Sequence, residues 1–333
     1  MIKKIKTIGI IGDGGWGTTL AVHLARKKAR VILWGAFADY VLEMERTRVN
    51  KKFLPGIKLP KNITLTSQLS SAIGPADLVI LATPSQYLRS VLKKIGTFDF
   101  SQKIILSVMK GIDTKSLERM SQIIHSELGN VHLAVLSGPT IAVEVAKGIP
   151  STAVIACHNR NIAQTLQKLI NSEQFRIYTN ADVIGVELGG SIKNIIAIAC
   201  GVCDGLGLGS NTKAAILTRG LAEMARLGAA LGAQTKTFFG LTGLGDLVTT
   251  CVSSNSRNRF VGEELAKGKS IQQITGAMSM VAEGVETAKA VYHLGQKMKI
   301  PMPISTEVYN IIYKKKKPRQ AVNDLMRRET GEE

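Results

Sequence analysis

Short apolar runs alternate with longer amphipathic stretches through the first half of the chain. The apolar runs are rich in Val, Ile and Leu and predict strands at Ile5–Ile11, Val31–Trp34, Leu78–Leu81, Ile104–Ser107, Leu133–Leu136 and Ala153–Ala156. The stretches between them predict helices, including Gly15–Lys28, Gln86–Lys94, Lys115–Leu128, Ile141–Lys147 and Ile162–Ile170. Buried strands that alternate with helices indicate a parallel sheet covered on both faces, and right-handed crossovers then give a doubly wound α/β fold.

The second half has a different pattern, because the strand signal stops after about Ala181. Long helical patterns follow at Thr212–Leu231, Ser256–Lys267, Val285–Met298 and Ser305–Tyr313. A chain of 333 residues usually forms two domains. We therefore expect an α/β domain over residues 1–185 and an all-α domain over residues 186–333.

The composition adds a strong positive charge, since 43 Lys and Arg residues against 25 Asp and Glu residues give a net charge of +18. Such a charge suits an anionic partner. The densest basic run, Lys314–Lys317, could bind nucleic acid, but it has no interleaved aromatic residues and follows a predicted helix C-terminus, where cations are favourable. We therefore expect a solvated helix end and no nucleic-acid partner.

Neither a membrane span nor a metal site is expected. The apolar runs are read as too short to span a bilayer, and the charged start Met1–Lys6 leads into a first strand without a cleavage pattern, which indicates a cytoplasmic protein. Cys200 and Cys203 form a C-x-x-C pair, but a zinc site would want a second such pair, and the histidines lack metal-ligand spacing. The two cysteines are more simply small core residues on one helix face.

Candidate chemistry begins directly after the first strand, where Gly12 to Gly17 match the motif G-x-G-x-x-G. Gly12 would make the tight turn, Gly14 would let a pyrophosphate approach the backbone, and Gly17 would let the helix pack on the strand. Gly15 and Trp16 open that helix, whose N-terminus presents amide donors to phosphate. Between a strand and a helix, this motif predicts dinucleotide binding.

The second strand lacks the acid that would bind an NAD ribose at its end. The chain reads Trp34-Gly35-Ala36-Phe37 there, and the nearest acid, Asp39, comes a few residues later. A site without that acid does not penalise a 2′-phosphate, so NADP is permitted and is a candidate for preference. Asp13 places a negative charge in the glycine loop, where it would repel phosphate unless it points away.

Lys193 lies in an apolar helical stretch from Gly189 to Cys200, with no acidic residue nearer in sequence than Glu187 and Asp204. Burial would favour its neutral amine, which can accept a proton. The alternative is a lysine whose stem crosses apolar surface while its head reaches water. We expect this helix to join the two domains and Lys193 to lie in the cleft between them, where ligand sites favour forming.

Two strand ends carry further candidate groups. Lys110 follows the strand Ile104–Ser107 and would point into the ligand crevice of an open α/β sheet, unless it is a solvated loop lysine. Ser137-Gly138-Pro139-Thr140 follows another strand, and Gly138 would leave backbone exposed to a ligand. Plain helix capping by Ser137 is the alternative.

The helical half offers a partner for the lysine and a site for an anion. Asp246 lies between tight turns and an apolar run, where it could orient the Lys193 amine or only complete a turn. Hydroxyls, amides and a guanidinium gather in Ser253–Arg259 and would suit a phosphate oxyanion. An ordinary polar helix start with a serine cap explains the same residues.

In order and spacing, these segments resemble the bacterial NAD(P)-dependent glycerol-3-phosphate dehydrogenases nearly end to end. The resembling segments are Gly12–Gly17, Phe53–Gly56, Lys110–Gly111, Ser137–Thr140, Gly189–Asn194, Thr218–Met224, Gly243–Leu247 and Ser256–Asn258. The chain departs from the family at Asp13, where a small residue is usual, and at Ala36-Phe37, where polar residues often meet the adenosine ribose. Members of the family fold as a Rossmann domain followed by an all-helical domain.

The resemblance implies reversible NAD(P)-dependent oxidation of sn-glycerol 3-phosphate to dihydroxyacetone phosphate without a metal, supplying glycerol 3-phosphate for phospholipid synthesis. A homodimer is a candidate assembly, which the sequence does not decide. Lys193 matches the proton acceptor, which Asp246 and Asn194 would hold in place. The residues that match substrate contacts are Lys110, Gly138, Thr140, Lys193, Asp246, Ser256, Arg257 and Asn258. Besides Gly12, Gly14, Gly15 and Gly17 of the motif, those that match cofactor contacts are Trp16, Lys110, Ala142, Arg257, Val281 and Glu283.

Two rival functions remain open at this point. A dehydrogenase of similar build that acts on a hydroxy acid would turn over a carboxylate in place of a phosphate ester. A nucleotide-sensing or nucleic-acid-binding protein that kept the fold would show salt-sensitive binding and no turnover. The intact set of Lys193 and Asp246 argues against the second rival.

Overall fold

A computed structural model describes residues 4–329, and its chain divides into two compact units. The first unit comprises Met1–Lys110 and Arg119–Glu187, and the second comprises Gly111–Glu118 and Leu188–Glu333. The division after Glu187 lies two residues from the boundary expected after residue 185. The segment Gly111–Glu118, expected in the first domain, groups with the second unit.

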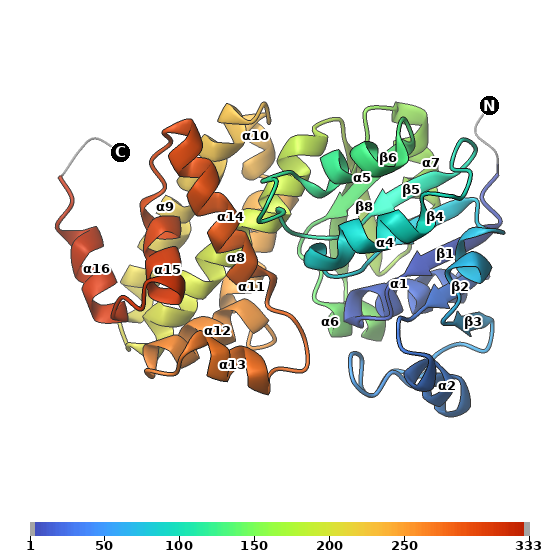
Figure 1. Cartoon of the computed structure of the whole chain (residues 1–333), viewed down its shortest axis with the longest axis horizontal. Helices are drawn as coiled ribbons and strands as arrows, with labels where there is room; N and C mark the ends of the chain where they lie inside the picture. Colours follow the sequence, from blue (N-terminus) through green and yellow to red (C-terminus); the bar gives the residue numbers. More distant parts are fainter. Residues whose placement is uncertain (1–3, 330–333) are drawn as a thin grey trace. The chain divides into compact units, whose positions relative to one another are not determined.

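The first unit is built on an eight-stranded sheet with the order β3-β2-β1-β4-β5-β6-β7-β8 (Figure 1). The strands are β1 (Thr7–Ile11), β2 (Arg30–Trp34), β3 (Ile63–Thr66), β4 (Leu78–Leu81), β5 (Ile104–Ser107), β6 (His132–Ser137), β7 (Ser151–Ala156) and β8 (Phe175–Asn180). The order reverses between β1 and β4, so the predicted doubly wound fold is confirmed. The sheet is not wholly parallel, however, because β7 runs antiparallel to β6.

The sequence pattern did not predict two of the strands, and a third strand begins later than expected. Both missed strands lie at the sheet edges: β3 and β8 alternate buried with exposed or half-buried residues, so they lack the continuous apolar run of a central strand. The first strand, expected from Ile5, begins at Thr7. Met1–Lys3, at the start of the expected charged segment, lie outside the described residues.

Helices cover both faces of this sheet. Those of the first unit are α1 (Gly15–Arg26), α2 (Ala38–Thr47), α3 (Leu69–Ile73), the 3₁₀ turn η1 (Ser85–Tyr87), α4 (Leu88–Ile95), α5 (Met120–Leu128), α6 (Ala142–Lys147) and α7 (Arg160–Ile170). Along β1, Ile8 and Ile10 enter one hydrophobic core together with residues of α1 and α7. Ile11, which points to the opposite face, enters a second core with residues of α4 and α5.

The turn from β1 into α1 brings two backbone segments into unusually close contact. Gly12 has a φ of +123°, a conformation that side chains with a Cβ rarely adopt. A Cβ at Gly17 would lie 2.0 Å from the carbonyl oxygen of Gly12, so glycine is needed for α1 to pack this closely. At Gly14 no heavy atom lies within 4 Å of the corresponding position, which leaves that backbone open to a ligand.

The second unit is helical, as the sequence pattern predicts (Figure 1). Its elements are α8 (Val183–Gly205), which starts before the division, α9 (Gly209–Ala230), α10 (Thr235–Phe238), the π-helical turn η2 (Leu241–Gly245), α11 (Asp246–Val252), α12 (Arg257–Ala266), α13 (Ile271–Ala277), α14 (Glu283–Met298), α15 (Pro303–Tyr313) and α16 (Pro318–Met326). The basic run Lys314–Lys317 joins α15 to α16, and within it Lys316 pairs with Glu307 and Asp324. Part of that positive charge is therefore neutralised locally.

We expected no apolar run long enough to span a bilayer. The length and composition of one helix show that this expectation is wrong. Among the described residues, α8 is long and apolar enough to do so. However, 94% of its most apolar window is buried inside the protein. Its apolar character is therefore explained by packing in the protein core.

Replacing Gly17 with alanine is expected to lower the free energy of unfolding by about 1–3 kcal/mol, because the added methyl group would push α1 away from the glycine loop. Gly14→Ala is the matched control, since it adds the same methyl group to open space and is expected to change stability by less than about 1 kcal/mol. Urea unfolding followed by circular dichroism measures both variants. Equal stability of the two would show that the close approach at Gly17 is not required.

Candidate active site

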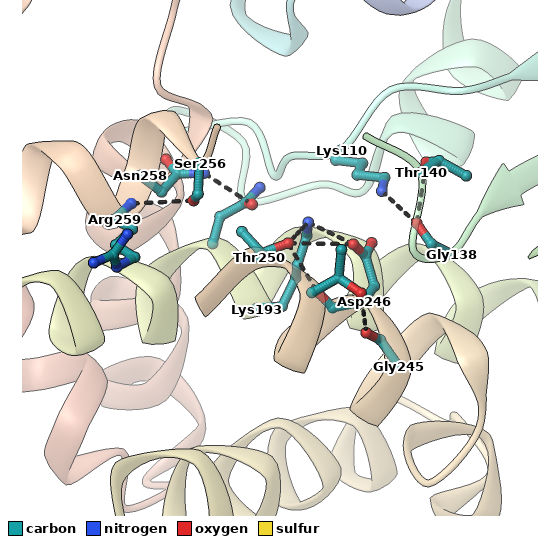
Figure 2. Close-up of polar contacts among 12 residues, drawn as sticks. Lys110, Gly138, Thr140, Lys193, Gly245, Asp246, Thr250, Ser256, Asn258 and Arg259 are labelled. Atoms are coloured by element: carbon teal, nitrogen blue, oxygen red, sulfur yellow. Dashed lines mark hydrogen bonds and ion pairs between the residues drawn. The ribbon is translucent and has the colours of Figure 1, made fainter. Parts of the chain in front are cut away.

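A buried ion pair joins Lys193 on α8 to Asp246 at the start of α11. The Lys193 Nζ lies 2.7 Å from the Asp246 Oδ1, and the residues are only 5% and 2% exposed (Figure 2). This confirms the predicted pairing and excludes a lysine whose head reaches bulk water. Because an unpaired buried charge is strongly unfavourable, each partner makes the burial of the other possible.

The chain brings this carboxylate to the lysine through a tight backbone contact. A Cβ at Gly189 would lie 2.6 Å from the carbonyl oxygen of Thr242, so only a glycine lets α8 approach the η2 turn this closely. Asp246 follows η2 directly, as the first residue of α11. A π-helical turn is rare and occurs often at functional sites.

Thr250 is a third member of this cluster that the sequence reasoning missed. Its Oγ1 accepts a hydrogen bond from the Lys193 Nζ and donates one to the backbone oxygen of Asp246 at 2.7 Å (Figure 2). Thr250 lies one helical turn after Asp246 on α11, so the spacing i, i+4 was the available signal. Two side chains of one short helix therefore contact the same amine.

Asn194 and Asn258 form a separate buried bridge between helices. The Nδ2 of Asn258 donates to the Oδ1 of Asn194 at 2.9 Å, and the Oδ1 of Asn258 accepts from the backbone N–H of Gly284 at 2.9 Å. This ties together α8, α12 and the start of α14. The bond fixes the side chain of Asn194, the residue that follows Lys193 in the sequence. The substrate contact predicted for Asn258 stays a prediction.

Arg257 and Ser256 mark the N-terminus of α12. The Ser256 Oγ accepts the backbone N–H of Arg259, so the alternative of a serine cap is confirmed for this residue. The exposed Arg257 donates from Nη1 to the backbone oxygen of Val281 at 2.5 Å, two residues before α14 begins at Glu283. A guanidinium beside a helix N-terminus is well suited to an anionic oxygen cluster.

In the first unit, the predicted residues at two strand ends lie together. The Lys110 Nζ donates to the backbone oxygen of Gly138 at 3.1 Å, and the Thr140 Oγ1 donates to the same oxygen at 3.1 Å (Figure 2). These contacts link the segments that follow β5 and β6, which are neighbours in the sheet. Ser137 does not cap through its side chain, since its buried Oγ has no partner among the described residues.

The glycine loop and its surroundings fit a dinucleotide. Gly14 is open to solvent or a ligand, and the Trp16 Nε1 is a buried donor without a partner among the described residues. Ala142 lies against the same helix, because its backbone oxygen accepts a hydrogen bond from Thr19 of α1 at 3.0 Å. A phosphate group could therefore approach an open backbone at a helix N-terminus.

A metal site would require several ligand side chains close together among the described residues. Within residues 4–329 there is no group of three His, Cys, Asp or Glu residues that could hold a metal ion. Cys200 and Cys203 are buried, as expected for small core residues.

Two sequence models of one family match this chain. The model described as NAD-dependent glycerol-3-phosphate dehydrogenase N-terminus matches residues 7–163, and the model described as its C-terminus matches residues 182–323.

Individual proteins are similar over nearly the whole chain. A protein of Chlorobium chlorochromatii named glycerol-3-phosphate dehydrogenase (NAD(P)+) is 44% identical over 330 residues, covering 98% of this chain and 99% of its own. A protein of the same name from Citrifermentans bemidjiense is 46% identical over 324 residues, covering 96% and 97%. The crystal structure of glycerol-3-phosphate dehydrogenase from Coxiella burnetii matches with a TM-score of 0.94 at 38% identity, covering 97% of this chain and 99% of that one.

Proposed function

The chain belongs to the NAD-dependent glycerol-3-phosphate dehydrogenase family, and from that premise we propose that Lys193 accepts and returns the proton of its reaction. The membership confirms the resemblance drawn from the motifs. The protein is an oxidoreductase that interconverts sn-glycerol 3-phosphate and dihydroxyacetone phosphate with NAD(P). The observation that supports the proton-transfer role is the buried contact of the Lys193 amine with Asp246 and Thr250.

Oxidation of a secondary alcohol needs a base, since the hydroxyl must lose its proton as the carbon becomes a carbonyl. Lys193 is this base: when the ammonium of the ion pair has lost a proton, the neutral amine takes the hydroxyl proton at Nζ. In the reducing direction its ammonium polarises the carbonyl and returns the proton to the oxygen. Bound NAD(P) supplies the hydride acceptor in one direction and the donor in the other.

Asp246 and Thr250 orient the amine for this transfer. The carboxylate stabilises the ammonium that forms when Lys193 takes the proton, and the hydroxyl of Thr250 accepts a hydrogen bond from the same nitrogen. Asn194, fixed by its bond to Asn258, holds the adjacent turn of α8. The arrangement is preorganised, so little reorganisation is needed when the proton moves.

The phosphate of the substrate is bound by the N-terminus of α12. Arg257 supplies a guanidinium, Ser256 a hydroxyl, and the helix its amide donors. Binding energy from this phosphate, remote from the reacting carbon, is available to align that carbon. Lys110, Gly138 and Thr140 are the corresponding substrate contacts of the first unit.

The remaining assignments are proposals of the same kind. We assign cofactor binding to the glycine loop, with Trp16, Lys110 and Ala142 in the first unit, and with Arg257, Val281 and Glu283 as further contacts. A cytoplasmic location, a homodimer and a supply of glycerol 3-phosphate to phospholipid synthesis complete the proposed function. The burial of α8 supports the assignment of this helix to the protein core rather than to a membrane.

Replacing Lys193 with alanine is expected to lower kcat by about a thousandfold, because general acid–base catalysis contributes roughly 10²–10⁴-fold. Turnover is followed by nicotinamide absorbance with dihydroxyacetone phosphate and each reduced cofactor. Cofactor affinity, measured separately by fluorescence, is expected to stay near the native value.

The matched control for this variant is Lys213→Ala. Lys213 is also ion-paired in the second unit, to Asp204, but Arg259 remains to neutralise that carboxylate. Its loss is expected to leave kcat within about twofold of native, as for substitutions away from a reacting group. Native turnover in a folded Lys193→Ala protein, with folding checked by circular dichroism, would remove the lysine from the mechanism.

Replacing Arg257 with alanine is expected to raise the KM for dihydroxyacetone phosphate by about tenfold to a hundredfold, the range expected when charge-assisted hydrogen bonds are lost. Arg259→Ala is the control, since that arginine lies on the same helix but pairs with Asp204 and Glu263. With unphosphorylated dihydroxyacetone and saturating cofactor, native and Arg257→Ala proteins should react alike, because saturation masks any loss of the cofactor contact assigned to Arg257. An unchanged KM would show that Arg257 does not bind the phosphate.

A further inference from the structure

The side chain of Asp13 reaches the end of β2, where the sequence has no acid. An ideal Cβ built on Gly35 would lie 2.5 Å from the Oδ2 of Asp13, so the carboxylate occupies the space that a side chain at position 35 would need. Gly35 directly follows Trp34, the last residue of β2. The carboxylate therefore comes from the glycine loop but lies at the strand end.

The loop holds Asp13 in this orientation. Its backbone oxygen accepts hydrogen bonds from the Thr18 Oγ1 at 2.9 Å and from the Asn50 Nδ2 at 2.7 Å. Asn50 is itself fixed by Tyr40, whose hydroxyl donates to the Asn50 Oδ1 at 2.7 Å. These two hydrogen bonds fix the main chain from which the Asp13 side chain extends toward the end of β2.

The carboxylate is nearly buried and incompletely satisfied. Asp13 is 9% exposed, and its Oδ2 has no hydrogen-bond partner among the described residues. Burial raises the pKa of this carboxyl group, against the opposing effects of its own backbone N–H and of the Lys52 ammonium. A buried acceptor without a partner is unfavourable, unless a ligand supplies the missing donor.

In folds of this kind, a bound dinucleotide would present a ribose hydroxyl near this strand end. In doubly wound folds the acid that binds the adenosine ribose stands at the end of the second strand, about twenty residues after the glycine motif. Gly35 is at that position, and its missing side chain makes room for the carboxylate of Asp13. The 2′-hydroxyl of NAD can donate a hydrogen bond there, whereas the 2′-phosphate of NADP brings negative charge and no such donor.

We infer that Asp13 selects NAD over NADP by accepting the ribose 2′-hydroxyl and repelling a 2′-phosphate. Attraction of one ligand and repulsion of its competitor act together, as specificity commonly requires. The repulsion is strengthened by the low exposure of the carboxylate, because charges interact more strongly where little water intervenes. The inference deepens the proposed function and rests on it, and it replaces the expectation that the missing acid favours NADP.

The test is to titrate NADH and NADPH separately into the full-length protein and to follow nicotinamide fluorescence at constant pH and ionic strength. The native protein is expected to bind NADH at least about tenfold more tightly than NADPH, since juxtaposed like charges are strongly disfavoured. Asp13→Asn keeps the shape but removes the charge. It is expected to bring the two dissociation constants within about threefold, mainly through tighter NADPH binding.

Asp39→Asn is the matched control, because it neutralises the nearest acid after β2, which is exposed on α2. It is expected to leave the NADH to NADPH ratio at its native value. Asp13→Ser, which restores a small residue, is the second variant if Asp13→Asn unfolds, and thermal unfolding checks both.

Each other outcome has a distinct meaning. A native preference for NADPH, or a ratio unchanged by both Asp13 variants, would overturn the inference while leaving the dehydrogenase function intact. If the ratio of the NADH and NADPH dissociation constants shifted in Asp39→Asn instead, Asp39 would be the selective residue and the inference would also be overturned. A native protein that binds neither nucleotide would contradict the proposed function itself.

Discussion

The buried ion pair between Lys193 and Asp246 is the interaction on which the rest of this structure depends. Burying two charges is costly, and apolar residues of similar size would often stabilise a fold equally well or better. A pair of this kind is therefore poorly explained by stability alone. The proton transfer proposed for Lys193 needs a fixed counter-charge away from bulk water, and Asp246 lies in position to provide it.

The surrounding backbone is arranged to make that pair possible. Gly189 lets α8 approach the η2 turn, which in turn sets Asp246 as the first residue of α11. Asn258 then connects α8 to the start of α14. A close backbone contact also shapes the first unit. Gly17 lets α1 pack against the glycine loop, and the backbone at Gly14, which caps this helix, stays open. In both units, close backbone contacts position the polar groups.

The sequence predicted the parts of this structure that depend on local pattern. Central strands such as β1 and β4 are continuous apolar runs, and the glycine motif has a fixed spacing, so both could be read directly. The edge strands β3 and β8 are half polar, and the antiparallel direction of β7 depends on how the chain returns to the sheet. The two edge strands were missed because the strands were predicted from continuous apolar runs, whereas the direction of β7 is not visible in local periodicity at all.

The candidate site likewise has residues whose role the sequence indicated and residues whose role it did not. The sequence indicated the pairing of Lys193 with Asp246 as one of two alternatives, because a lysine is unusual in an apolar helical stretch, whereas Asp246 could also have only completed a turn. Thr250 was missed, since threonine is ordinary in a helix and its i, i+4 spacing from Asp246 becomes a signal only once Asp246 is known to begin a helix that follows a π-helical turn. The position of the Asp13 side chain depends on tertiary contacts with Asn50 and Gly35, so it is not visible in the sequence of β2 itself.

The most direct test of the central claim is a double-mutant cycle in kcat/KM with Lys193→Met, Asp246→Asn and the combined variant. If the carboxylate acts through the amine, the combined variant should be no slower than Lys193→Met alone, because the second change removes an effect already lost. Losses that simply multiply would show that the two residues act independently. That result would contradict the assignment of Asp246 as the partner of a catalytic lysine.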